Sequence, residues 1–118
     1  MCSSDLTIVG WVMEAAQIPV IVKLTPNVTD VTKSARAAKK AGANAISLIN
    51  TINSITQVNL DKMCPEPYVA GKSTHGGYCG PAVKPIALNM VQSCAADPLV
   101  QLPISGIGGI SKIGRAHV

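Results

Sequence analysis

Residues suited to binding an anionic cofactor and a heterocycle follow three apolar segments of the 118-residue chain. They are a lysine with a threonine, an asparagine with a threonine, and a cluster of glycines: Lys23 and Thr25, Asn50 and Thr51, and Gly106, Gly108 and Gly109. An amine balances negative charge, an amide pairs with the donor–acceptor edge of a heterocycle, and glycines leave backbone N–H groups free to hold a phosphate. Each alone is also a common turn or surface residue. In combination they suit a flavin and a planar nitrogenous substrate.

Alternating strands and helices are predicted around these residues. Continuous apolar runs predict strands at 19–24 and 44–50, and a third strand in "LPISGIGGI" that enters a glycine turn. Helical spacing predicts helices over 7–17, about 30–41 and about 82–96. Thr29 or Asp30 can cap the second helix, and Gly42 can end it. The stretch 51–80 predicts a long loop, and loops of that length are usually functional.

The order of these elements predicts an α/β fold with parallel strands and right-handed crossovers. Three parallel strands do not close a barrel, so we expect a partial (β/α)8 TIM barrel of about three consecutive strands with their helices. Active sites of such barrels lie at the carboxyl ends of the strands. Lys23, Asn50 and Gly108 fall at those ends.

Composition and charge exclude several classes of protein. The chain is 47% hydrophobic and 14% charged, which is typical of a globular domain, and its 3% aromatic content implies an aliphatic core. The net charge of +4 is scattered, without a basic block, so nucleic acid is not an expected partner. No apolar run is long enough for a membrane span, and no secretory signal is visible. The four cysteines lack metal-site spacing and predict reduced thiols, no metal site and a cytoplasmic protein.

The two ends of the chain resemble translated adapter DNA. Residues 113–118 can be encoded by a short DNA whose reverse complement encodes Met-Cys-Ser-Ser-Asp, the first five residues of the chain. The next two bases of that reverse complement allow only leucine, which is the residue found at position 6, Leu6. That DNA resembles a standard short-read sequencing adapter, and Lys112 fits the preceding codon. We therefore expect 1–6 and 112–118 to be non-native and adapter-derived, and 7–111 to be an internal segment of a longer protein. Cys2 and His117 would then carry no function.

Four segments carry a family resemblance. "KLTPNVTD", "SLINTINSI", "GGYCGPAVKPIALNMV" and "LPISGIGGI" resemble the FMN-binding barrel domain of the dihydropyrimidine dehydrogenases, above all the pyrimidine-reducing subunit of the bacterial NAD-dependent type. The likeness spans essentially all of 7–111. It implies a flavin oxidoreductase that reduces uracil or thymine to the 5,6-dihydro form with electrons from NAD(P)H. It also implies a partner, an NAD(P)H-oxidising flavin and iron–sulfur subunit, because the clusters and the NAD(P)H site lie outside this chain.

The resemblance also implies roles for individual residues. Lys23 would contact FMN and balance the negative charge of its reduced form, and Asn50 and Thr51 would hold the pyrimidine base. Backbone atoms would approach FMN at four further positions, Gly80, Ile107, Gly108 and Gly109. The family's catalytic acid is a cysteine upstream of this segment, so no residue of this chain is expected to be catalytic, and Cys79 is expected to be an ordinary loop thiol.

Two alternatives stay open. The dihydroorotate dehydrogenases share the fold and the arrangement of lysine, asparagine and paired glycines, so the parent protein could instead be a dihydroorotate dehydrogenase. The chain as it stands could also be a non-catalytic truncation. Three parallel strands cut from a closed barrel expose two sheet edges and an uncovered apolar face. We expect the isolated chain to be inactive.

Overall fold

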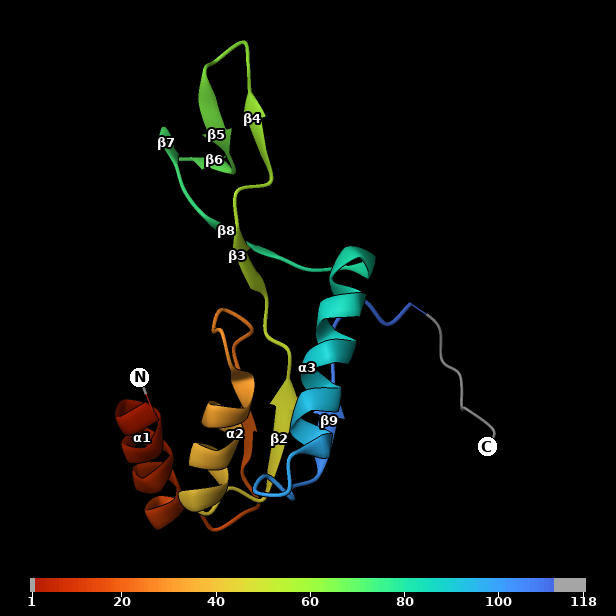
Figure 1. The fold of residues 1–118 in the computed structure, drawn as a ribbon. Coiled ribbons are helices and arrows are strands. Elements are labelled where there is room, and N and C mark those ends of the chain that lie inside the picture. The colour runs from red at the N-terminus through yellow and green to blue at the C-terminus, as the bar shows by residue number, and fades with distance from the viewer. Residues whose placement is uncertain (1, 112–118) are drawn as a thin grey trace.

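The computed structural model describes residues 2–111 and contains one parallel sheet of three strands (Figure 1). The strands are β1 (Ile21–Lys23), β2 (Ala45–Leu48) and β9 (Ile104–Gly106), in the order β1-β2-β9. Their register aligns Val22 with Ile46 and Ile104. The α/β fold with parallel strands is therefore confirmed, and the arrangement is that of a partial TIM barrel.

Helices α2 (Val31–Lys40) and α3 (Lys84–Ala96) cover one face of this sheet, and α1 (Cys2–Ala15) packs beside α2 (Figure 1). A short 3-10 helix, η1 (Pro81–Val83), leads into α3. The core between sheet and helices is aliphatic, as predicted, and Ile46 and Leu48 of β2 are fully buried in it. None of the helices within 2–111 is long and apolar enough to cross a membrane. α1 begins at Cys2 and so includes part of the segment expected to be adapter-derived, whereas 112–118 lie outside the described residues.

Helix α2 begins and ends where its sequence predicts. The Asp30 carboxylate accepts a hydrogen bond from the Thr32 N–H at 3.1 Å and another from the Thr32 hydroxyl at 2.6 Å. This side chain satisfies one of the N–H groups that the first turn leaves free. The helix is capped at Ala41, and Gly42 follows with a φ of 93°, a conformation that favours glycine.

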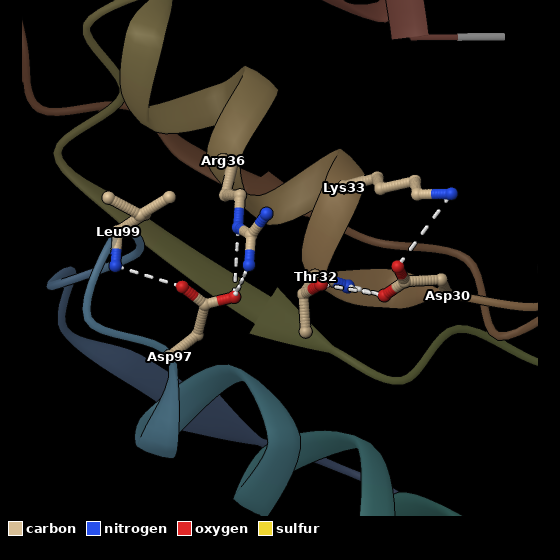
Figure 2. Close-up of polar contacts among 6 residues, drawn as sticks. All are labelled: Asp30, Thr32, Lys33, Arg36, Asp97 and Leu99. Carbon is tan, nitrogen blue, oxygen red and sulfur yellow. Dashed lines mark hydrogen bonds and ion pairs between the residues drawn. The ribbon is translucent and has the colours of Figure 1, made fainter.

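An ion pair joins α2 to the turn after α3 (Figure 2). The Arg36 guanidinium contacts the Asp97 carboxylate through Nη2 at 2.6 Å and Nε at 2.9 Å. The second carboxylate oxygen of Asp97 accepts the Leu99 N–H at 2.8 Å. The hydrogen bond from Arg36, and then that from Leu99, hold the pKa of Asp97 below its usual range. The contact fixes the spacing of the two helices that cover the sheet.

Replacing Asp97 with asparagine is expected to lower the melting temperature at neutral pH by several degrees, because asparagine keeps the Leu99 contact but loses the charge. A carboxylate whose pKa is lowered on folding stabilises the fold above its unfolded pKa of about 3.9, and this stability is lost as pH falls through the folded pKa. The difference in melting temperature between the wild type and Asp97→Asn should therefore disappear below about pH 3. Thermal unfolding followed by circular dichroism at both pH values checks this. Asp61→Asn, at an exposed site, is the control, and a difference that persists unchanged in acid would contradict the ionic contribution.

Residues 52–78 differ from the predicted loop, because they form three antiparallel strand pairs. These are β3 (Ile52–Ser54) with β8 (Gly76–Tyr78), β4 (Gln57–Asn59) with β5 (Cys64–Glu66), and β6 (Tyr68–Val69) with β7 (Lys72–Ser73). They form an arm, residues 52–78, that projects from the carboxyl edge of the parallel sheet (Figure 1). Strands this short do not produce a readable alternation of apolar and polar residues, which is why the sequence predicted a loop.

Candidate functional site

A cleft of about 270 Å³ lies at the carboxyl edge of the parallel sheet, between the three strand ends and the root of the arm. The residues to which the family resemblance assigns a binding role all line it: Lys23, Asn50, Thr51, Gly80, Ile107, Gly108 and Gly109. Thr25, which was singled out by its position after the first strand, does not line it. The cleft is also lined by Ile49, Tyr78, Cys79, Val83 and Ile110. Residues separated by up to 87 positions in the sequence, from Lys23 to Ile110, therefore share one site.

Backbone hydrogen bonds continue beyond the strand ends and hold the walls of the cleft together. The Asn50 N–H donates to the Leu24 carbonyl at 3.0 Å, which ties the segment after β2 to that after β1. On the other side of β2, the Ile107 N–H donates to the Leu48 carbonyl at 2.6 Å, and the Ile49 N–H donates to the Ile107 carbonyl at 2.9 Å. The three segments that carry the predicted residues are thus extensions of one hydrogen-bonded sheet.

Lys23 supplies a free positive charge to the cleft. Its register partners are Ser47 and Ser105, whereas the alternate positions, such as Ile46, pack toward the helices. Lys23 therefore lies on the face opposite the helices, which in a closed barrel is the interior. Among residues 6–111, whose side chains the structure describes, no carboxylate forms an ion pair with its ammonium group. Of the described residues that line the cleft, Lys23 alone carries a charge, so the cleft favours an anionic group.

The glycine turn after β9 leaves no room for side chains. Gly109 has a φ of 70°, and a Cβ added there would lie 2.8 Å from the Gly80 carbonyl oxygen and 3.0 Å from the Lys84 backbone nitrogen. Gly108 has a φ of 127°, and its Cβ would lie 2.9 Å from Ala87. The turn packs directly on the start of α3, where the Lys84 N–H already donates to the Pro81 carbonyl of η1 and Pro85 has no N–H. The open backbone of the glycine turn, rather than the helix start, is therefore the feature that could hold a phosphate group.

Asn50 and Thr51 line the cleft just after β2, the central strand of the sheet. The Thr51 N–H donates to the Asn50 side-chain oxygen at 2.8 Å, which leaves the Asn50 NH2 group as a donor for a ligand. Thr51 is closely backed by the arm, because a Cβ added to Gly77 would lie 2.5 Å from its hydroxyl oxygen. An amide and a hydroxyl are therefore both available in this part of the cleft.

The structure also corrects the list of candidates. Gly106 does not line the cleft, since a Cβ there would face Val91 of α3, on the helix side of the sheet. Tyr78 and Cys79 do line it, and neither was predicted as a binding residue. Their position depends on the pairing of Ile52 with Tyr78, which the sequence does not reveal, although the adjacent "GGYCG" motif was a signal. Cys79 is a free, exposed thiol.

No group of three or more histidine, cysteine or acidic side chains within residues 6–111, the part of the chain with described side chains, is arranged to hold a metal ion. The arrangement that is present can hold an anionic group between a free lysine and a backbone cradle. It can also offer an amide and a hydroxyl to a heterocycle.

Known proteins share this sequence pattern. The family model described as "Dihydroorotate dehydrogenase" matches residues 3–115. The NAD-dependent dihydropyrimidine dehydrogenase subunit PreA of Escherichia coli K12 is 47% identical over 100 residues, which cover 84% of this chain and 24% of that protein. The chloroplastic dihydropyrimidine dehydrogenase (NADP(+)) of Arabidopsis thaliana is 42% identical over 105 residues, covering 86% of the chain and 25% of that protein.

A third relative carries a different name. The catalytic subunit of dihydroorotate dehydrogenase B (NAD(+)) from Caldicellulosiruptor saccharolyticus is 50% identical over 99 residues, which cover 84% of this chain and 31% of that protein. The chain thus spans between a quarter and a third of the length of these relatives. The chain is about equally similar to the two kinds of enzyme.

Proposed function

This chain belongs to the dihydroorotate dehydrogenase family, and on that premise we propose that it forms part of the FMN and substrate site of an enzyme that reduces uracil or thymine to the 5,6-dihydropyrimidine. The observation that carries the proposal is the convergence of three strand ends on one cleft. That cleft joins a free lysine, a backbone cradle and an amide–hydroxyl pair. The native part is 7–111 in this proposal, and 1–6 and 112–118 are adapter-derived.

The residues present fit FMN. Gly108 packs so closely on Ala87, and Gly109 on Gly80 and Lys84, that a Cβ at either position would overlap these neighbours. The cradle of Gly80, Gly108 and Gly109 would hold the phosphate end through its backbone N–H groups. Ile107 would approach FMN beside the cradle without donating to the phosphate, because its N–H already donates to the Leu48 carbonyl. Lys23 would lie by the ring system and balance its negative charge. When bound, FMN supplies the hydride chemistry that no side chain of this cleft can perform.

Asn50 and Thr51 would orient the pyrimidine. The Asn50 NH2 group is a donor and the Thr51 hydroxyl is both donor and acceptor, which matches the alternating carbonyl and N–H groups of uracil. Lys23 is the one charged residue among the described lining residues, and it is committed to the cofactor. This leaves no described cation in the cleft for the carboxylate of orotate, which supports an uncharged pyrimidine. The proton donor, a cysteine in this proposal, lies in another part of the enzyme.

The whole enzyme is proposed to be cytoplasmic and to draw electrons from NAD(P)H through a partner subunit with flavin and iron–sulfur clusters. The name of the PreA relative, which is called a subunit, supports a partner of this kind. Dihydroorotate dehydrogenase is the second candidate, favoured by the 50% identity to such a catalytic subunit. Product analysis distinguishes them: the full-length enzyme should form dihydrouracil from uracil, and formation of orotate from dihydroorotate alone would favour the second candidate.

The isolated 118-residue chain is expected to lose FMN on desalting and to form no dihydrouracil with a chemical reductant. Its cleft of about 270 Å³ is smaller than the usual range of about 300–1,000 Å³ for ligand sites. Within 2–111, β1 and β9 each pair only with β2, so both outer edges of the sheet stay open. The visible flavin absorbance of the desalted protein is the measurement. Flavin retained in proportion to protein would contradict this expectation.

A further inference from the structure

One side chain beside the cleft joins the loop after β1 to the start of the arm. The Asn27 NH2 group donates to the Thr51 carbonyl at 3.1 Å, and the Asn27 side-chain oxygen accepts the Asn53 N–H at 2.8 Å. The amide therefore brackets Ile52, the first residue of β3, from both sides. One amide thus satisfies the carbonyl of the residue before β3 and an N–H within it.

A second set of hydrogen bonds fixes Asn27 itself. The Thr25 hydroxyl oxygen accepts from the Asn27 backbone N–H at 3.2 Å and from the Asn27 NH2 group at 3.1 Å. Thr25 is two residues beyond Lys23, the last residue of β1. Asn27 thus follows Lys23 by only four residues, and two of the residues between them, Leu24 and Pro26, are buried.

Thr51 is held from two directions. Asn27 binds its carbonyl on one side, and Gly77 of β8 lies so close on the other that a Cβ there would overlap the Thr51 hydroxyl. The neighbouring Asn50 is tied to Leu24 through its N–H. Backbone pairing thus restrains Asn50, whereas the position of Thr51 relative to β1 depends on the Asn27 side chain.

We propose that Asn27 is a positioning residue that holds the Asn50 and Thr51 pair in register with Lys23. This inference rests on the proposed function, because it assigns the pyrimidine to that pair. Asn27 does not line the cleft and would touch neither ligand. The hydrogen bonds of Asn27 go to Thr25, Thr51 and Asn53 and not to the cradle of Gly80, Gly108 and Gly109, so loss of Asn27 should affect the pyrimidine and spare FMN.

The test uses the full-length enzyme that carries this segment, with Asn27→Ala, Asn27→Asp and the control Asn44→Ala. Asn44 is also exposed and its side chain also accepts a backbone N–H, that of Val20 at 2.8 Å, but it precedes β2, at the far end of the sheet. Asn27→Ala should raise KM for the pyrimidine about tenfold, which matches the loss of one or two hydrogen bonds, with FMN content unchanged. Asn27→Asp keeps the acceptor for the Asn53 N–H but loses the donor to the Thr51 carbonyl. Its KM for the pyrimidine should therefore lie between that of the wild type and that of Asn27→Ala.

Amide hydrogen exchange on the same proteins gives a readout independent of activity. The Asn53 N–H should exchange faster in Asn27→Ala than in wild type or Asn44→Ala. An unchanged KM, an equal loss of FMN, or unchanged exchange at Asn53 would overturn the positioning role. A wild type that turns over dihydroorotate instead of uracil would refute the proposed substrate only, because KM for that substrate then reports on Asn27 in the same way.

Discussion

Replacing Lys23 with methionine is expected to lower kcat for pyrimidine reduction by about 10²–10³-fold in the full-length enzyme. Removal of one group that stabilises charge at a reacting centre typically has an effect of this size. Methionine is close to lysine in length and has a similar apolar stem but no charge. The fall in kcat would therefore report the contribution of the charge alone. No other described residue that lines the cleft is charged, so none can take over this role.

Steady-state kinetics with uracil, together with the FMN content of the purified protein, check this prediction. Lys72→Met is the matched control, because Lys72 is exposed in β7 of the arm, away from the cleft. Lys23→Arg should recover part of the activity because it keeps the charge. If Lys23→Met retained wild-type kcat with full FMN loading, Lys23 would have no part in the reaction.

Replacing Gly109 with alanine is expected to weaken FMN binding by about 10–100-fold. The added Cβ would lie within 3.0 Å of the Gly80 carbonyl oxygen and the Lys84 backbone nitrogen, which are backbone atoms and cannot rotate away. Forcing an extra carbon into packed surroundings costs about 1–3 kcal/mol, and each 1.4 kcal/mol is about a factor of ten in affinity. A φ of 70° adds strain for any residue with a Cβ.

A second glycine separates the steric effect from the backbone strain. Gly71 has a similar φ of 78°, but a Cβ there would meet nothing within 4 Å, and it lies in the arm. Gly71→Ala should therefore carry the strain without affecting FMN. Fluorescence titration of the apoprotein with FMN gives the two dissociation constants. Equal constants for both variants would show that Gly109 does not form the cradle.

The sequence predicted the sheet and its helices because each element is locally consistent. The run at 19–24 is apolar and β-branched, Asp30 caps α2, and Gly42 follows it in the left-handed conformation that a helix end favours. Since the carboxyl ends of parallel strands meet at one edge of the sheet, the sequence also predicted Lys23, Asn50 and Gly108 at that edge. In the structure all three line one cleft there.

The arm could not be predicted in the same way. Its strands are two or three residues long, and their pairing depends on partners more than twenty residues apart in the case of Ile52 and Tyr78. The contribution of Tyr78 and Cys79 to the cleft follows from that pairing. The ion pair of Arg36 with Asp97 and the bridge from Asn27 to Thr51 are likewise contacts between distant segments, which hydrophobic periodicity does not encode.

The alternation of faces explains the error at Gly106. Gly106 and Gly108 both follow the strand run in the sequence, but Gly106 is aligned with Leu48, whose side chain lies in the core with the helices. A residue at the end of a strand reaches the site only if its position in the pleat faces that way. Register, which the sequence alone does not provide, therefore decides which glycine of a run can contact a ligand.

The proposed role of this cleft is to bring FMN together with an uncharged pyrimidine. The pre-reduced full-length enzyme should be mixed anaerobically with uracil, and in a parallel experiment with orotate, while the visible flavin band is recorded. Uracil is expected to restore the oxidised band, with dihydrouracil formed in proportion to the flavin reoxidised, whereas orotate is not. Restoration by orotate but not by uracil, or by neither, would contradict this role.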